Sequence, residues 1–241
     1  MELNTGGKFN SLDEKDDINL SQADRAYHYI RDLILNLKIL PGQPLSETDF
    51  TEKLDMSRTP IREAFFRLKS DGLVETVGNR GTFVKLLTLN DIRKIYETAE
   101  GLEGMIAYLA ANRADKNGHK DLLNWVEVME EALAKKDFKM WVRGDEGFHN
   151  TLHNLCNNNY LVNHLNLLYN QIHRVRLMTL KLSYNYMSTK EHRELYEVLK
   201  EGNGDLAMRL THKHWRRVRE LVLDVISPMH LSSNLENDQN K

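Results

Sequence analysis

The chain has 241 residues, with 33 basic and 35 acidic side chains and a formal net charge of −2 at pH 7. This length suits one large domain or two modest ones, and the balanced charge argues against a histone-like protein that coats nucleic acid by charge alone. The single cysteine, Cys156, excludes an internal disulfide and is typical of a protein in a reducing cytoplasm.

The two ends of the chain are polar. Residues 1–20 and 231–241 are rich in Asn, Ser, Asp and Lys, which predicts disordered tails. No apolar run approaches the length of a membrane span, and the first residues lack the apolar core of a signal peptide. We therefore expect a cytoplasmic protein without a membrane partner.

Residues 21–87 predict a helix-turn-helix with a supporting helix before it. The supporting helix, over 26–37, has its apolar stripe at Tyr29, Ile30, Leu33, Ile34 and Leu37. After a turn at 41–44, Ser46 is the expected N-cap of a second helix that ends at Leu54. Asp55-Met56 then forms a tight turn into a third helix.

The third helix, from Ser57 to Leu68, carries a face suited to DNA. The hydroxyl of Ser57 is expected to cap it, and Pro60 is tolerated in its first turn. Its buried face is predicted at Ile61, Ala64, Phe65 and Leu68. Arg58 and Arg62 lie one turn apart on another face, beside Thr59. A guanidinium can bond guanine O6 and N7 together, so this pattern indicates a helix that reads bases in the major groove.

Two short strands are predicted next, over 72–77 and 82–86, with a turn at 78–81. A hairpin after a helix-turn-helix makes a winged helix, with Arg80 and Gly81 at the tip, near the minor groove or the backbone of the DNA. The alternative is an exposed helix whose arginines pair only with Glu63 and solvent.

This segment resembles the GntR family of bacterial transcriptional regulators. The specific signature is the run Ser57-Arg58-Thr59-Pro60-Ile61-Arg62-Glu63-Ala64, supported by Pro41, Gly42, Leu45, Ser46-Glu47, Leu68, Gly72-Leu73-Val74 and Arg80-Gly81-Thr82-Phe83-Val84. The resemblance implies that Arg58, Thr59 and Arg62 contact bases, while Ser57 and Gly81 contact the backbone or minor groove. Asp55 stands where the family usually has Gly, and Thr48 where some relatives have a third reading Arg.

Residues 90–228 predict an antiparallel bundle of six or seven helices, so the fold class is mainly α. The first helix, from 91 to about 115, has apolar positions that include Tyr96, Leu102 and Ile106. Asn90, Ser188 and Asp205 are the expected caps of three of the helices, and the last of these should end near Ile226.

Four side chains of this bundle are candidates for a metal site: Asp145, His149, His192 and His214. Asp145 and His149 share a helix face, and the other two come from different helices. One carboxylate and three imidazoles suit zinc, nickel or another divalent transition metal ion, with positions left for an exchangeable ligand. On spacing alone, an Asp–His pair one turn apart is more often a surface hydrogen bond.

The motif Asp145-x-x-Phe148-His149, with Glu191-His192 and His214, resembles the FCD effector-binding domain of the FadR subfamily of GntR regulators. In metal-binding members one Asp and three His at these positions hold the ion. That subfamily often places Arg where this chain has Ala99, so Arg174 or Arg176 is expected to supply the positive charge for a carboxylate effector. His153 is a further candidate for the effector cavity.

The sequence therefore predicts a metabolite-responsive repressor that binds a pseudo-palindromic operator in double-stranded DNA as a homodimer. Its effector is expected to be a small organic acid that ligates the metal. Two alternatives stay open: a regulator whose bundle binds ligand without a metal, and a metal-dependent hydrolase joined to a DNA-binding domain.

Overall fold

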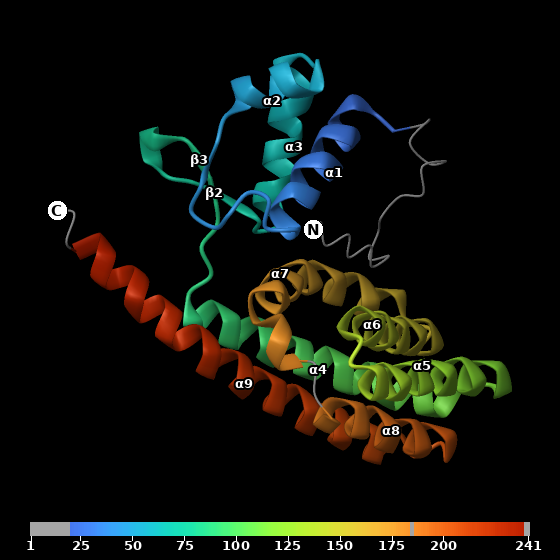
Figure 1. Cartoon of the computed structure of the whole chain (residues 1–241). Helices are drawn as coiled ribbons and strands as arrows, with labels where there is room; N and C mark the ends of the chain where they lie inside the picture. The colour runs from blue at the N-terminus through green and yellow to red at the C-terminus, as the bar shows by residue number, and fades with distance from the viewer. Residues whose placement is uncertain (1–19, 184–185, 239–241) are drawn as a thin grey trace. The chain divides into compact units, whose positions relative to one another are not determined.

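A computed structural model describes the backbone of residues 20–183 and 186–238 (Figure 1). The chain divides into two compact units between Thr88 and Leu89, between the two predicted domains 21–87 and 90–228, and each unit is described by itself. Of the tail predicted for residues 1–20, residues 1–19 lie outside the described residues. Within the described ranges, no helix is both long enough and apolar enough to cross a membrane.

The N-terminal unit is a winged helix, as predicted. Its elements are α1 (Gln22–Leu35), β1 (Pro44–Leu45), α2 (Glu47–Leu54), α3 (Arg58–Ser70), β2 (Val74–Thr76), a 3-10 turn (Gly78–Arg80) and β3 (Thr82–Val84). The strands form an antiparallel sheet in the order β1-β3-β2. The sequence prediction missed β1, because proline gives no strand signal. Pro44 lies on an edge strand, where proline is tolerated.

Helix α1 begins four residues earlier than the apolar pattern predicted. The cause is a capping box, in which Ser21 accepts from the amide of Asp24 and the Asp24 side chain accepts from the amide of Ser21. The buried stripe therefore runs through Ala26, Tyr27, Ile30 and Ile34, while Tyr29 is 36% exposed. The helix ends at Leu35, and Leu37 adopts a left-handed backbone beyond it.

The turn between α2 and α3 depends on Asp55. Its φ of 50° and ψ of 51° place it in the left-handed region, which Asp tolerates better than most residues. Ser57 occupies the N-cap position of α3, but its hydroxyl makes no capping hydrogen bond, contrary to the expectation. The hydroxyl is exposed and is not engaged in holding the helix.

The C-terminal unit contains six helices in the described residues, in agreement with the predicted bundle. They are α4 (Leu89–Arg113), α5 (Lys116–Lys135), α6 (Phe138–Leu155), α7 (Asn159–Ser183), α8 (Tyr186–Lys200) and α9 (Gly204–Asp238). Figure 1 shows the long helices α4 and α9 packed side by side, with α5 lying against α6. Helix α8 packs against both α5 and α9, and α7 packs against α4.

Several predicted helix ends are wrong. Asn90 and Ser188 lie inside the first turns of α4 and α8 and are not caps. The side chain that accepts a hydrogen bond at the start of α9 belongs to Asn203, which bonds the Leu206 amide, and Asp205 lies in the first turn. Helix α9 passes the predicted end near Ile226 and includes residues 231–238, which were expected to be a disordered tail.

Replacing Leu68 by Ala is expected to lower the free energy of unfolding of the N-terminal unit by about 2–5 kcal/mol. Leu68 is fully buried on the inner face of α3, so truncation of its side chain leaves a cavity. Phe66 lies two residues earlier on α3 and is 71% exposed, so Phe66→Ala should change the free energy of unfolding by about 0.5 kcal/mol or less. Urea unfolding followed by circular dichroism measures both. Equal losses would show that the two faces of α3 are assigned wrongly.

Candidate DNA-reading face and metal centre

All six residues predicted to contact DNA are exposed on the N-terminal unit. They are Ser57, Arg58, Thr59, Arg62, Arg80 and Gly81. Ser57 occupies the N-cap position of α3, Arg58, Thr59 and Arg62 lie in its first two turns outside the set of buried residues, and Arg80 and Gly81 end the turn before β3. The winged helix therefore leaves both predicted contact regions accessible.

Arg62 is held by an ion pair on this face. Its Nε donates to Oε2 of Glu47, at the start of α2, over 2.9 Å. The Arg62 side chain is 65% exposed, and an exposed pair of this kind contributes only about 0–1 kcal/mol. The guanidinium is thus oriented in the free protein, yet it can exchange this partner at little cost.

Helix α3 is fixed against α1 by a small polar cluster. Arg67 donates to Asp24 over 2.5 Å, and its guanidinium lies over the ring of Tyr27. The Tyr27 hydroxyl donates to Asp71, just after α3, and burial together with this bond raises the pKa of Tyr27 to about 12. The hydroxyl therefore remains a donor across the physiological pH range, which keeps the exposed start of α3 in a defined orientation.

The wing turn needs glycine at its end. Gly81 has a φ of 102° and a ψ of −161°, a backbone conformation that is essentially restricted to glycine. The space around it is open, so the backbone angle and not packing requires the glycine. Arg80 directly precedes it and is exposed.

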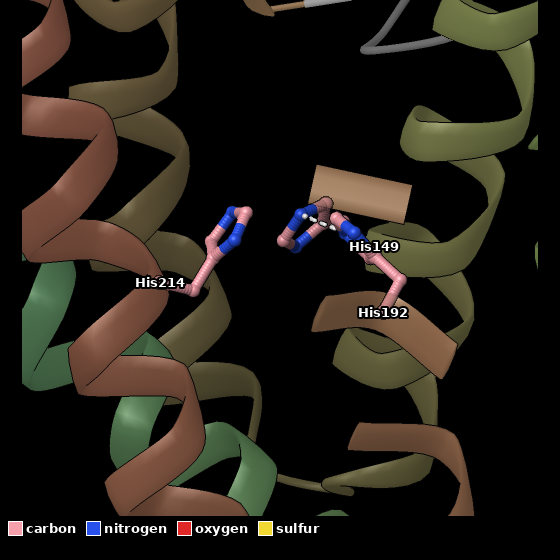
Figure 2. A group of neighbouring side chains, drawn as sticks. All are labelled: His149, His192 and His214. Carbon is pink, nitrogen blue, oxygen red and sulfur yellow. Dashed lines mark hydrogen bonds between the residues drawn. The ribbon is translucent and has the colours of Figure 1, made fainter. Parts of the chain in front are cut away.

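In the C-terminal unit, three predicted metal ligands converge from three helices. His149 lies on α6, His192 on α8 and His214 on α9, and one ring nitrogen of each lies within 4.8 Å of the others. Figure 2 shows the three rings gathered between the helices, with a dashed line joining His149 and His192. The Nε2 atoms of these two residues lie 3.3 Å apart. Two such nitrogens at this separation need either a shared proton or a cation between them.

Hydrogen bonds on the far side of two rings fix which nitrogen faces the centre. Nδ1 of His192 lies 2.7 Å from the Ser188 carbonyl, and Nδ1 of His214 lies 2.6 Å from the Glu191 carboxylate. Both partners only accept, so each Nδ1 carries a proton, and Nε2 is the nitrogen that faces the centre. Metal-binding histidines usually have such partners, so these two residues fit a divalent ion.

Asp145 also reaches this centre. It lies one turn before His149 on α6, and its Oδ1 is 3.5 Å from Nε2 of His192. Its Oδ2 accepts from Arg176 over 2.7 Å. Burial alone would raise the pKa of Asp145, but the Arg176 guanidinium and the nearby histidines lower it to about 2. The carboxylate is therefore ionised at neutral pH, as a metal ligand must be.

Burial controls the charge of His192. It lowers the pKa of His192 to about 3, and positive charge on His214 and His149 would act in the same direction. His192 is therefore neutral at pH 7 and keeps the lone pair that a metal ion requires.

A second group of donors adjoins the first and was not predicted as a site. Glu103 on α4 is fully buried, and its Oε1 accepts from Nε2 of His153 over 3.0 Å and from the hydroxyl of Tyr169. His149 connects the two groups, because its Nδ1 lies 3.6 Å from the same oxygen. Burial raises the pKa of Glu103, but His153 and His149 outweigh this effect and the net pKa is lowered.

Glu103 left a signal in the sequence that the prediction did not use. It falls within the regular buried stripe of α4, formed by Ile92, Tyr96, Ala99, Glu103, Ile106 and Ala110. The prediction gave that turn to Leu102, which is only partly buried. A carboxylate in an apolar stripe requires a buried partner, and this requirement marks Glu103 as a candidate.

A cavity of about 40 Å³ opens beside the histidines. It is lined by Tyr96, Trp141, Asp145, His149, Tyr169, Ile172, Arg176, Ser188, His214, Trp215 and Val218. Of the three predicted effector contacts, only Arg176 lines it. Arg174 is buried elsewhere on α7 and donates to Gln171, and His153 is directed to Glu103.

Family models match most of both units. The model of bacterial regulatory proteins of the gntR family matches residues 22–84, and the FCD domain model matches residues 94–217. Among relatives, the HTH-type transcriptional repressor RspR of Escherichia coli is 25% identical over 200 residues, which cover 83% of this chain and 88% of RspR.

Two further relatives agree. An uncharacterized HTH-type transcriptional regulator of Agrobacterium vitis is 38% identical over 130 residues, covering 53% of this chain and 76% of the relative. A structure described as a GntR transcriptional regulator from Rhodococcus sp. RHA1 is 27% identical, has a TM-score of 0.67 and covers 85% of this chain and 99% of its own. These relatives are regulators and not enzymes, which argues against the hydrolase alternative. The chain therefore belongs to the GntR family, with an N-terminal GntR helix-turn-helix and a C-terminal FCD domain, and is a DNA-binding transcriptional regulator.

Proposed function

We propose that this regulator is a metabolite-responsive repressor whose FCD domain senses a small organic acid through a bound divalent metal ion. The observation that carries this proposal is the convergence of three imidazoles from α6, α8 and α9, two of which have their outer nitrogens already hydrogen-bonded. A repressor is favoured because the relative from Escherichia coli is described as one.

On the DNA side, Arg58, Thr59 and Arg62 read base edges in the major groove. Ser57, Arg80 and Gly81 contact the backbone or the minor groove. The exposure of all six supports this assignment, as does the Ser57 hydroxyl, which is not used for capping. Two copies of the chain in a homodimer would present one such face to each half of a pseudo-palindromic operator.

In the FCD domain, Asp145, His149, His192 and His214 hold the ion, for which zinc and nickel are the best candidates. Bound there, the ion acts as a Lewis acid that accepts a carboxylate oxygen of the effector. Arg176 lines the same cavity and supplies the positive charge that Ala99 does not. It is oriented by Asp145, and both residues are largely buried.

The size of the cavity explains how binding could alter the protein. One water needs about 10–15 Å³ of such space, so 40 Å³ accommodates an ion and a few small atoms. An organic acid would have to move the helices that carry the ligands. A ligand that binds an altered packing more tightly shifts the protein toward it, and this differential affinity is what a change in operator binding requires.

Arg62→Ala should weaken specific DNA binding by about 1–3 kcal/mol and relax the base preference at one position in each half-site. The measurement is a titration with a duplex selected from a random library and with single-base variants of it. Arg143→Ala, which removes an exposed charge from α6, is the control and should bind normally. If Arg62→Ala retains full affinity, α3 is not the reading helix.

His192→Ala and His214→Ala should each abolish stable metal binding. We expect about one equivalent of transition metal in the wild-type chain and less than about a tenth in either variant, because each variant lacks one of the four proposed donors and so binds the ion more weakly. Elemental analysis after purification without chelator measures this. The matched control is His164→Ala, an exposed histidine on α7, which should leave metal content unchanged. A wild-type chain that takes up no metal even on titration would favour the metal-free regulator.

Arg176→Met should lower the free energy of unfolding of the metal-free protein by about 3–5 kcal/mol, since it leaves the buried Asp145 carboxylate without its cation. The comparison is Arg193→Met, which breaks the exposed bidentate pair with Glu130 and should cost about 1 kcal/mol or less. Chemical denaturation in the presence of chelator reports both values. Similar losses would argue that Arg176 is not a buried partner of Asp145.

A further inference from the structure

The three histidines of the metal centre are not supported alike. The Nδ1 atoms of His192 and His214 have acceptors on the side away from the centre, at 2.7 Å and 2.6 Å. Nδ1 of His149 is buried and has no hydrogen-bond partner among the residues that the structure describes. A buried ring N–H without an acceptor costs free energy and leaves the proton position of the ring undetermined.

The acceptor that faces this nitrogen is Glu103. Its Oε1 lies 3.6 Å from Nδ1 of His149, slightly beyond hydrogen-bond distance, and its Oε2 is buried without a partner among the described residues. A small rotation of the His149 ring toward Glu103 would give Nδ1 its acceptor. The carboxylate itself is held in place, because Tyr169 and His153 both donate to Oε1.

We propose that Glu103 is a positioning residue for the metal centre. It accepts the Nδ1 proton of His149 and so keeps the lone pair of Nε2 directed at the ion. This inference rests on the proposed metal centre. It assigns a role to Glu103, which is not one of the four proposed ligands. Mutation of a carboxylate that orients a metal-binding histidine in this way typically lowers the metal affinity by 10–100-fold.

The surrounding residues define how Glu103 acts. The hydroxyl of Tyr169 comes from α7 and the ring of His153 from α6, while Glu103 itself lies on α4. Burial and the neighbouring carboxylate raise the pKa of Tyr169, so its hydroxyl stays a donor. Glu103 therefore joins α4 to the ligand helix α6 through His149, with α7 holding the carboxylate.

The same three donors could instead hold a second ion, since Glu103, His149 and His153 offer atoms within 4.8 Å of one another. We favour the positioning role because Oε1 already accepts two hydrogen bonds, and because His153 would have to give up the proton that it donates to Glu103. The two roles differ in stoichiometry: one ion per chain for a positioning residue, two for a dinuclear site.

The test compares Glu103→Gln with Glu100→Gln in the full-length chain. Glu100 is a buried carboxylate on the same helix whose ion pairs, in the part of the chain that the structure describes, are with Arg216 and Arg219 and not with a ligand histidine, so it controls for loss of a buried charge. Co²⁺ affinity by chelator competition should fall 10–100-fold in Glu103→Gln and stay near wild type in Glu100→Gln. In the zinc-loaded protein, ¹⁵N spectra should show the His149 Nδ1–H signal shifted or lost only in Glu103→Gln.

If Glu103→Gln fails to fold, Tyr169→Phe replaces it, and a smaller loss in the same direction is expected because the carboxylate loses one of its two donors. Equal Co²⁺ affinity in wild type and Glu103→Gln, or two equivalents in wild type with one lost in the variant, would overturn the positioning role alone. A wild-type chain that binds no Co²⁺ would overturn the metal centre as well, and operator binding would still test the regulator separately.

Discussion

Gathering one carboxylate and three imidazoles beside a cavity of about 40 Å³, with all but His214 buried, is the constraint on which the helical unit depends. Buried polar groups are costly unless they are paired. Three of these side chains are therefore bonded on the outer side to another helix or to their own backbone: Asp145 to Arg176, His214 to Glu191 and His192 to the Ser188 carbonyl. Within the described residues, the outer Nδ1 of His149 lacks such a partner. The ring nitrogens that face inward are the atoms that a cation would bind.

In the winged helix, the proposed contact residues are exposed and not buried. Arg62 is oriented there by a weak, exposed ion pair with Glu47. The rigid contacts lie behind the reading face, where Arg67, Tyr27 and Asp24 connect α3 to α1. Weak pairing at the front and firm pairing behind suit a surface that must exchange ion-pair partners when it meets phosphates and bases.

Sequence reasoning predicted the fold class and the family correctly, because helix periodicity and the Ser57–Ala64 signature are both local. It also named the four residues that gather at the centre, although their role as ligands is still a prediction. It failed where tertiary contacts decide. Glu103 lies in the apolar stripe of α4, but its partners His153 and Tyr169 become apparent only from the packing of α4 against α6 and α7. Ser188 resembled a cap because cap chemistry does not reveal where a helix begins, and Ser57 occupies the N-cap position without making the capping bond.

The chain path gives Glu103 a wider significance. It belongs to α4, and only residues 85–88 separate this helix from β3, the last strand of the wing. If His149 moves when a metabolite binds the ion, Glu103 would move with it and would shift α4. The segment 85–88, which joins α4 to β3, would then shift as well. The FCD domain would then be coupled to the winged helix through one continuous stretch of backbone. A flexible insertion at 85–88 would leave a protein that binds its operator but no longer responds to the metabolite.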